Sequence, residues 1–600
     1  MSSEGIQTAV PDSLLHRLFG PGGPVQSTSG RPLKRKRPTN LLFDVDESPS
    51  LLVGLGVAVQ HIFLMSVGWL YVVLIMDATG GTSAQTMNVI RMSMIASGIA
   101  TILQARGGIV GSGYLSPLTT SLTFLPSSIL AIRLGGFPLL FGMIVTAGVS
   151  MCLLSRVTSR LRVLFPPEVT GLMVSMSGLQ LIALGCPRFV GYTGPGFVPD
   201  LRTVAVGAAT LLGMIGATVW NRGKLHALPI LLGLAIGYAL AIALNVMPLG
   251  QLTHDLSAPW ANLPQPVHGG FAFRWVLFAP FLIACLTASL KSVGDITLCQ
   301  KINDANWKRT DMKSVAGGIF ANGVGVTVAG LIGGTAQNTV SSSVGLSSAS
   351  GITSRSVAVP VGLGVITLAF FPKIAALFAA MPTPAMGAML IYSACFIVLG
   401  GFQLLTSRLL DSRRIFAVGI ALIFGLSVEI SPDLYRFVPA VLQPIFSSSA
   451  SLATVLVTVL SLLFRIGIGK RKAFQLSPGE SSMDALRGNL EEQGAAWGMR
   501  PEVVTRAEHA IYETTTIVAL RSPHSGPMDI TMEFDELSLD VEIEYEGSPF
   551  ELATRPPAID EIGSEESVIA MAGYLIRQYA DRVRVKSSQN LCRVLLHFEH

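Results

Sequence analysis

The sequence predicts an all-α polytopic membrane protein with fourteen membrane-spanning segments, followed by a small cytosolic α/β domain. Half of the 600 residues are hydrophobic and only 13% are charged, whereas a soluble domain carries about 25% charged residues. The mean hydropathy is +0.56. Charge is also unevenly distributed: residues 476–600 hold 22 acidic and 10 basic residues, and the rest of the chain holds 15 acidic and 32 basic. A basic membrane body therefore precedes an acidic soluble module.

The N-terminal residues 1–50 are polar, and a basic cluster at residues 31–37 lies just before the first apolar segment. This position predicts a cytoplasmic N-terminus and argues against both a cleaved signal peptide and nucleic-acid binding. Apolar segments of spanning length then follow near 51–76, 87–105, 113–133, 136–155, 166–186, 202–220, 226–247, 272–299, 314–333, 343–352, 356–380, 385–401, 412–430 and 447–466. An even number of spans, with basic residues after the last one, returns the C-terminus to the cytoplasm.

These features divide the chain into four predicted parts. They are a cytosolic segment at 1–50, a transmembrane domain at 51–467, a linker at 468–499 and a cytosolic α/β domain at 500–600. The expected location is a bacterial-type inner (plasma) membrane, with the lipid bilayer as a partner. The six cysteines are scattered singly, so neither a disulfide framework nor a paired-cysteine metal site is indicated.

Two of the apolar segments are interrupted by small and hydroxyl residues, at Arg106–Pro126 and at Thr335–Arg355. Irregular backbone is tolerated in a membrane only where it is buried in protein or lines a cavity, and transporters bind substrate at such breaks. The alternative is a pair of small-residue helix-packing faces. The breaks fall in the third and tenth segments, which predicts two inverted repeats of seven. Their half-helix N-termini would then face each other at the bilayer midplane and favour anionic or carbonyl-rich substrates.

Few ionisable residues lie deep in these segments, and such residues are functional candidates because burying them is costly. Lys291 and Asp295 lie four residues apart in the eighth segment and so share a helix face. They either contact substrate or a coupling ion, or neutralise each other in a structural role. His61 follows Gln60 in the first segment, and Tyr114 can stack on a planar ligand or pack in a cavity wall. No catalytic triad, phosphate-binding loop or metal cluster stands out, so no enzyme activity, cofactor or metal is predicted.

Four motifs occur in order along the membrane body: Gln60-His61, FPPEVTG at residues 165–171, SVGD at residues 292–295 and NTVSSSVGL at residues 338–346. At these spans they resemble the motifs of the nucleobase–ascorbate transporter family (xanthine/uracil permease-like), over about residues 51–467. The resemblance implies fourteen spans in two inverted repeats and a small-molecule substrate. It also implies alternating access, in which a core of spans 1–4 and 8–11 rocks against a gate of spans 5–7 and 12–14. Dimers are common in the family, so a homodimer is expected.

The chain departs from the family pattern at the substrate site. The family's eighth-span glutamate is replaced by Lys291, its tenth-span Gln/Glu-Asn pair by Ser342 and Ser343, and its ninth-span aspartate by Asn322. A carboxylate accepts hydrogen bonds, whereas an ammonium only donates them. We therefore expect an anionic or acceptor-rich substrate, urate-like or a small organic anion, and a lysine that could replace a coupling cation. The predicted substrate-binding residues are Lys291, Ser342, Ser343, Tyr114 and Gly345, and the predicted coupling or supporting residues are His61, Gln60, Asp295 and Asn322.

Two alternatives stay open on the sequence alone. One is a conventional xanthine or uracil symporter driven by H⁺ or Na⁺. The other is a transporter-like sensor that signals through residues 500–600. In that module the pattern predicts helices at 503–520 and 567–580 and strands at 538–545 and 590–598. This order loosely resembles the ATP-binding fold of anti-sigma-factor kinases without its Asn and D-x-G-x-G turn, so a regulatory, dimer-supporting or stabilising role is expected instead of ATP binding.

Overall fold

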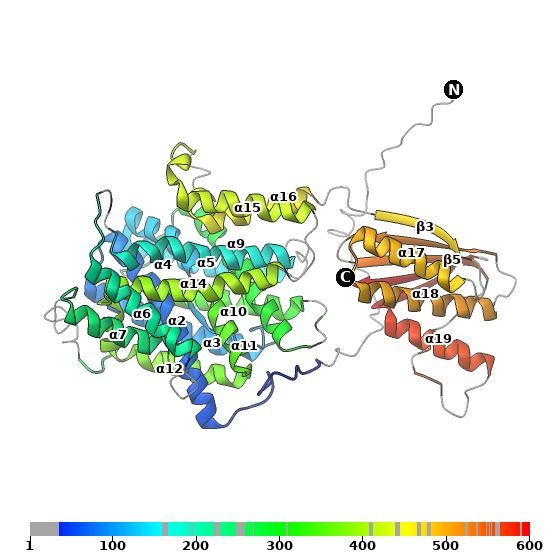
Figure 1. Cartoon of the computed structure of the whole chain (residues 1–600), viewed down its shortest axis with the longest axis horizontal. Coiled ribbons are helices and arrows are strands. Elements are labelled where there is room, and N and C mark those ends of the chain that lie inside the picture. Colours follow the sequence, from blue (N-terminus) through cyan, green and yellow to red (C-terminus); the bar gives the residue numbers. More distant parts are fainter. Residues whose placement is uncertain are drawn as a thin grey trace. The chain divides into compact units, whose positions relative to one another are not determined.

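The computed structural model of the chain describes most of its residues in two compact units, one of residues 35–463 and one that includes residues 464–600 (Figure 1). The described residues are 35–158, 166–192, 194, 196–220, 229–247, 259–267, 269–305, 307, 310–406, 412–438, 445–464, 470–476, 482–521, 526–535, 538–547, 549–550, 552–553, 555–557, 564–588 and 591–599. The basic residues 31–34 and Arg465 lie outside them.

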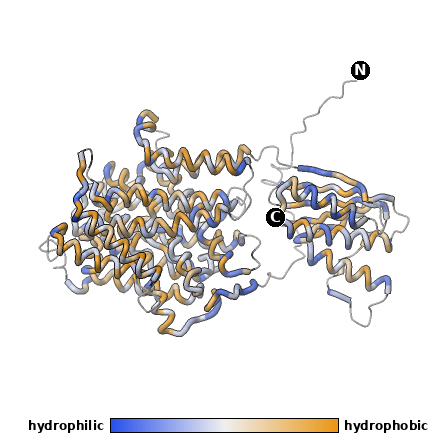
Figure 2. The backbone as a smooth tube through the Cα atoms, viewed as in Figure 1, coloured by the Kyte–Doolittle hydropathy of each residue, from blue (hydrophilic) through white to orange (hydrophobic). Residues whose placement is uncertain are grey.

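The unit of residues 35–463 is a bundle of helices that are hydrophobic along most of their length (Figure 2). Within the described residues, eight helices are long and apolar enough to cross a membrane. They are α2 (Leu51–Thr79), α3 (Ser83–Arg106), α4 (Leu125–Thr158), α5 (Pro167–Val190), α6 (Leu201–Val219), α9 (Trp275–Ile302), α10 (Met312–Ile332) and α14 (Thr383–Leu405). A ninth crossing arises if α12 (Ala358–Ala369) and α13 (Pro372–Ala379), which are bent by 85°, act together.

Three further helices, α7 (Pro229–Ala243), α15 (Ser412–Ile430) and α16 (Ser449–Leu463), overlap predicted spans without passing this length and composition test in the described residues. The predicted third and fourth spans are joined in α4, where Gly135 and Gly136 depart from helical geometry and kink the helix. The helices thus support a multi-pass membrane protein, and the count of fourteen spans stays a prediction.

The two interrupted segments meet in the middle of this bundle. In the first, strand β1 (Leu118–Thr120) and the short helix η1 (Leu122–Phe124) precede α4, and in the second, β2 (Gln337–Thr339) precedes α11 (Ser341–Ser350). The strands pair antiparallel, with Leu118 opposite Thr339 and Thr120 opposite Gln337. Extended backbone in an apolar interior needs partners for its N–H and C=O groups, and here each strand provides them for the other. The two short helices therefore start from one common ribbon.

Helices α5 and α14 form a closely packed pair beside this ribbon. A Cβ atom at Gly401 of α14 would lie 2.2 Å from the Ser175 Oγ of α5, and one at Gly171 would lie 2.5 Å from a backbone nitrogen of α14. Only glycine permits such an approach of two helix backbones. The pair consequently holds the polar side chains of α5 and α14 at fixed positions.

Residues 35–50, which fall within the predicted cytosolic segment 1–50, pack on the helical unit. Phe43 forms a parallel bridge with Ile352, and the Arg355 N–H donates to the Val45 carbonyl over 3.1 Å. Asp46 accepts from Arg35 over 3.0 Å and pairs with Arg355 over 2.9 Å. We call residues 35–50 the strap. The strap lies beside the segment that comes directly after α11, and α11 itself begins shortly after β2.

The second unit contains a five-stranded antiparallel sheet in the order β3-β4-β5-β7-β6. Its strands are β3 (Lys470–Leu476), β4 (Met528–Phe534), β5 (Ser538–Glu546), β6 (Arg582–Ser588) and β7 (Leu591–Glu599), and its helices are α17 (Ser482–Trp497), α18 (Pro501–Arg521) and α19 (Glu565–Tyr579). Alternate β4 residues from Met528 to Phe534 are buried, while Asp529 and Glu533 are exposed. One sheet face therefore packs on the hydrophobic core shared with the helices.

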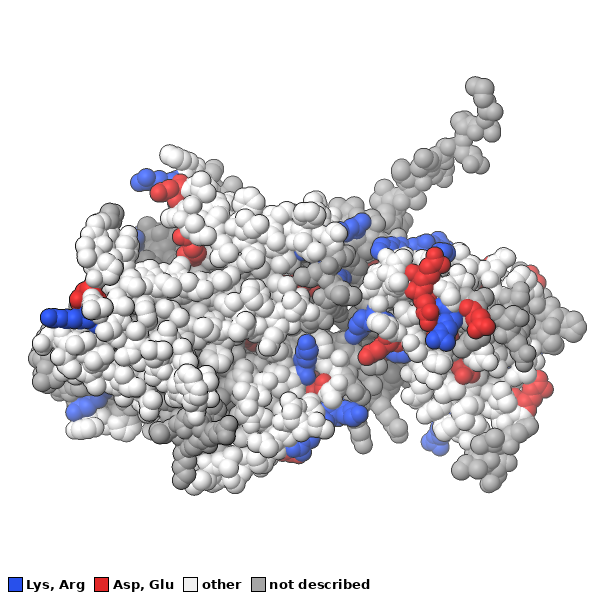
Figure 3. All heavy atoms as spheres, viewed as in Figure 1, with Lys and Arg blue, Asp and Glu red and all other residues white. Residues whose placement is uncertain are grey.

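Helices α18 and α19 and strands β5 and β7 lie at the positions of the four predicted elements. Residues 468–499, predicted as a linker, instead contain β3 and α17, which belong to this unit. Because Lys470–Lys472 are charged, the sequence did not indicate a strand at these residues. In the structure they begin β3, which pairs with β4 so that Arg471 lies opposite Glu533. In the face shown in Figure 3, charged side chains are sparse over the helical unit and frequent over the sheet-containing unit.

Candidate functional site

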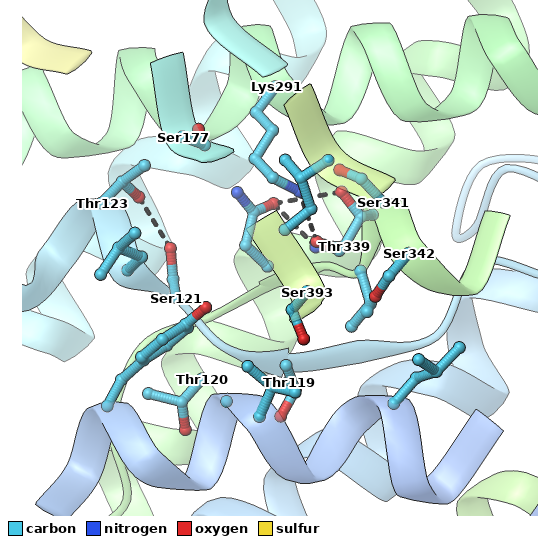
Figure 4. A pocket seen from close by; sticks show the side chains of 18 residues that line it. Thr119, Thr120, Ser121, Thr123, Ser177, Lys291, Thr339, Ser341, Ser342 and Ser393 are labelled. Carbon is cyan, nitrogen blue, oxygen red and sulfur yellow. Dashed lines mark hydrogen bonds between the residues drawn. The ribbon is translucent and has the colours of Figure 1, made fainter. Parts of the chain in front are cut away.

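A polar cavity lies where the β1–β2 ribbon meets the helices around it (Figure 4). Its walls come from α2, the β1–η1 segment, α5, α9, the β2–α11 segment and α14. Ten of its eighteen lining residues carry a hydroxyl group. The cavity volume is about 50 Å³, which is room for only a few water molecules. A larger ligand would require its walls to separate.

Lys291 brings a positive charge to this cavity from α9. Its side chain is 10% exposed, and its Nζ donates to the Asp295 Oδ2 over 2.8 Å and to the Thr339 carbonyl over 2.6 Å. An ammonium has three N–H donors, so one remains after these two bonds. Lys291 lines the cavity and Asp295 does not. The pair thus presents its positive end to the cavity.

Asp295 holds three donors at once and is 1% exposed. Besides Lys291, the Thr339 hydroxyl donates to its Oδ2 over 2.5 Å, and the Ser341 hydroxyl donates to its Oδ1 over 2.6 Å. A buried charge is tolerated when it is paired and hydrogen-bonded. This carboxylate therefore ties α9 to the β2–α11 segment and fixes Lys291.

A second hydrogen-bonded group holds the side chain of Asn338, which lies in strand β2 of the ribbon. The Ser292 hydroxyl donates to the Asn338 Oδ1 over 2.6 Å, and the Asn322 Nδ2 donates to the Ser292 Oγ over 2.6 Å and to the Asn338 Oδ1 over 3.1 Å. Asn338 lines the cavity, while Asn322 and Ser292 do not. Asn322 is thus placed to orient Asn338, at one remove from any ligand in the cavity.

The predicted residues of the tenth segment separate into different environments. Ser342 lies in the first turn of α11 and lines the cavity. Ser343 is fully buried outside the lining, and its hydroxyl has no hydrogen-bond partner among the described residues. Gly345 also lies outside the lining. No side chain in the described part of the chain caps the N-terminus of α11, so its first N–H groups add partial positive charge beside the cavity.

Three other predicted residues are not brought to the cavity. Tyr114 precedes the ribbon and packs beneath Arg35, whose guanidinium carbon lies 5.9 Å from the ring centroid. On α2, Gln60 is half-buried and His61 is fully buried, one turn before the lining residue Leu64. Neither ring nitrogen of His61 has a partner among the described residues.

The structure adds lining residues that the sequence did not indicate. Ser177 of α5, Ser393 of α14 and residues 119–123 of the β1–η1 segment also line the cavity. No local signal distinguishes Ser177 or Ser393, because both lie in apolar helices: Ser177 follows Ser175 in α5, and Ser393 is the one serine of α14. Within the described residues, no group of three His, Cys, Asp or Glu side chains is arranged to hold a metal ion.

A polar cavity between interrupted segments of a multi-pass helical bundle defines a membrane transporter. The chain belongs to the Permease family, whose xanthine/uracil permease sequence model matches residues 54–434. The family resemblance drawn from the four motifs is thereby confirmed, and the protein is a transporter of small molecules, not an enzyme.

Several characterised or curated proteins are similar over most of their length. A putative purine permease of Clostridium perfringens is 29% identical over 429 residues, which cover 71% of this chain and 93% of that protein. The xanthine permease XanP of Escherichia coli is 28% identical, covering 73% and 98%. The uric acid transporter UacT of Escherichia coli is 28% identical, covering 71% and 89%.

Two solved structures resemble the fold remotely. The transmembrane domain of the cyanobacterial bicarbonate transporter BicA is 14% identical and has a TM-score of 0.41, covering 70% of this chain and all of that one. The murine anion transporter Slc26a9 is 10% identical with a TM-score of 0.45, covering 72% and 71%.

Proposed function

We propose that the protein transports a planar, acceptor-rich anion, urate-like in its chemistry, by alternating access. The observation that carries this proposal is the ammonium of Lys291, which keeps one N–H donor for the cavity after its bonds to Asp295 and Thr339. The uncapped N-terminus of α11 adds partial positive charge on the same side. The similarity to purine, xanthine and uric acid transporters supports a nucleobase-like substrate.

The acceptors near the cavity are largely engaged. Asp295 accepts from three donors, and Asn338 accepts from Ser292, Asn322 and the Thr339 N–H. A neutral nucleobase brings ring N–H groups that would have to rely on hydroxyl oxygens as acceptors, and each buried donor left unpaired costs about 1–3 kcal/mol. An anionic base has lost one of these protons and brings an acceptor in its place. This difference favours the anion.

We propose further that transport needs no coupling cation. The Lys291 ammonium sits among oxygen atoms, the Asp295 carboxylate and the Thr339 carbonyl, and supplies there a positive charge that is part of the protein. The lysine and aspartate charges cancel, so each translocation would carry the charge of the substrate. The second candidate is a cation-coupled carrier of neutral xanthine or uracil, and the names of the xanthine permeases among the relatives favour xanthine as the substrate.

The cavity walls fit a core that rocks against a gate. In the division that the family implies, α2, the ribbon, α9 and α11 belong to the core, and α5 and α14 belong to the gate.

We also propose an inner-membrane location with cytoplasmic termini, a homodimer, and a regulatory or dimer-supporting role for residues 500–600.

The test combines ligand-induced stabilisation with flux. The purified protein would be melted with urate, xanthine, uracil, orotate and ascorbate across pH, since a ligand at ~100 times its dissociation constant adds about 2.7 kcal/mol. Urate should stabilise more than uracil. In proteoliposomes, an inside-positive potential should accelerate urate uptake, while Na⁺ or pH gradients at clamped potential should not. Greater stabilisation by neutral uracil would contradict the anionic substrate, and uptake driven by a clamped Na⁺ or pH gradient would contradict uncoupled transport.

A further inference from the structure

The Ser393 hydroxyl is a buried polar group that faces the cavity without a partner. Ser393 lies on α14 and is 1% exposed, and it lines the cavity. Its Oγ has no hydrogen-bond partner among the described residues. Figure 4 shows its side chain within the group of lining side chains. A buried hydroxyl that stays unpaired costs about 1–3 kcal/mol, so this group favours a ligand that accepts its hydrogen bond.

Most other hydroxyls of the lining are already engaged. Thr119 donates to the Met65 carbonyl over 2.8 Å, and Ser177 donates to the Met173 carbonyl over 2.9 Å. The hydroxyls of Thr339 and Ser341 both donate to Asp295. Ser177 is the informative comparison, because it also reaches the cavity from the α5–α14 pair. It bonds to its own helix, as buried serines commonly do, whereas Ser393 does not.

Ser393 and Lys291 line the cavity from two different groups of helices. Lys291 is fixed on α9 by its bonds to Asp295 and Thr339, while Ser393 stands on α14, which packs against α5. A ligand that accepts a hydrogen bond from each would connect the two groups of helices. These two hydrogen bonds form together only when both groups of helices contact the ligand. They therefore contribute to the specificity of the closed site.

We infer that Ser393 is a specificity-determining residue. Its hydroxyl donates to a ring-nitrogen or oxo acceptor of the substrate from α14, while the free N–H of Lys291 donates from α9. This inference rests on the proposed function, because it requires an acceptor-rich substrate in this cavity. A neutral donor edge is accommodated less well, since the hydroxyl would then have to turn its lone pair to the ligand and leave its own proton unpaired.

The test uses the full chain, urate as the probe and three serine variants. Ser393→Ala should weaken urate binding about tenfold, the effect of one lost hydrogen bond to a charged acceptor, and should leave the unliganded melting temperature equal or higher. Ser175→Ala, the matched control on α5, removes a buried hydroxyl that lies outside the cavity lining and donates to the Val398 carbonyl, and should leave urate affinity unchanged. Ser393→Thr keeps the hydroxyl and should retain most of the affinity.

The outcomes separate this inference from the function on which it rests. A Ser393→Ala variant that binds urate within about twofold of the wild type, while Lys291→Met loses urate binding, would overturn the role of Ser393 and leave the proposed function standing. A wild-type protein that does not bind urate would overturn both. An equal loss in Ser175→Ala and Ser393→Ala would also overturn the role of Ser393, because it would reveal a general sensitivity of the α5–α14 pair.

Discussion

Lys291→Met tests the charge at the centre of the site. Methionine keeps a long apolar side chain and removes the ammonium, which leaves the carboxylate of Asp295 buried with only the Thr339 and Ser341 hydroxyls. Removing one partner of a buried ion pair typically costs about 3–5 kcal/mol, because the other charge stays behind uncompensated. We expect a lower melting temperature together with complete loss of stabilisation by urate.

A double variant separates stability from binding. Lys291→Met combined with Asp295→Asn carries no unpaired charge, so most of the lost stability should return. Stabilisation by urate should stay absent, because the donor is still missing. Melting curves of the wild type, both single variants and the double variant, each with and without urate, measure the two effects.

One result would refute this reasoning. If the double variant regains stabilisation by urate, then Lys291 serves only to neutralise Asp295, and the pair has the purely structural role that the sequence left open. A Lys291→Met variant as stable as the wild type would contradict the expectation that the change leaves an uncompensated buried charge on Asp295.

Three further perturbations follow from the structure. Asp46→Asn removes the two ion pairs of Asp46, with Arg35 and Arg355, and should lower the free energy of unfolding by about 1 kcal/mol or less, because these pairs are exposed. Gly68→Ala places a Cβ 2.3 Å from the Thr119 Oγ1 and should cost about 1–3 kcal/mol by overpacking, with reduced uptake because the cavity wall shifts. Burial raises the pKa of the Glu513 carboxyl in α18, partly offset by a nearby histidine, so the folded state binds this proton more tightly than the unfolded one. Glu513→Gln should therefore stabilise the sheet-containing unit at pH 7, and its advantage over the wild type should shrink as the pH falls toward that raised pKa.

Two of these perturbations have a control in the same chain. Lys36→Ala also removes a charge from the strap and should be neutral, because the backbone of Lys36 contacts Asp304 and Ala305 while its side chain is exposed. Gly56→Ala on the same helix as Gly68 has no atom within 4 Å of the new Cβ. Equal melting temperatures for Asp46→Asn and the wild type would remove the strap as a stabilising contact. A Glu513→Gln advantage that grows as the pH falls would contradict the raised pKa.

Much of the fold follows from local properties of the chain. Apolar runs predict helices because hydrocarbon requires internal hydrogen bonding, and each predicted span overlaps a helix in the structure. The boundaries of the soluble unit are harder to predict from the sequence. The charge of Lys470–Lys472 indicated the end of a span, whereas pairing with β4 makes these residues part of a strand. Strand pairing is non-local, so composition does not indicate it.

The sequence by itself determined the class of protein, the two interrupted segments, the family motifs, and the placement of Lys291 and Asp295 on one helix face. These features depend on composition or on spacing within a single helix. Only the tertiary structure decided which side chains share the cavity. It places Ser393 in the cavity lining and Tyr114 beneath the strap, because helix rotation and the β1–β2 register depend on packing between segments that are far apart in the chain.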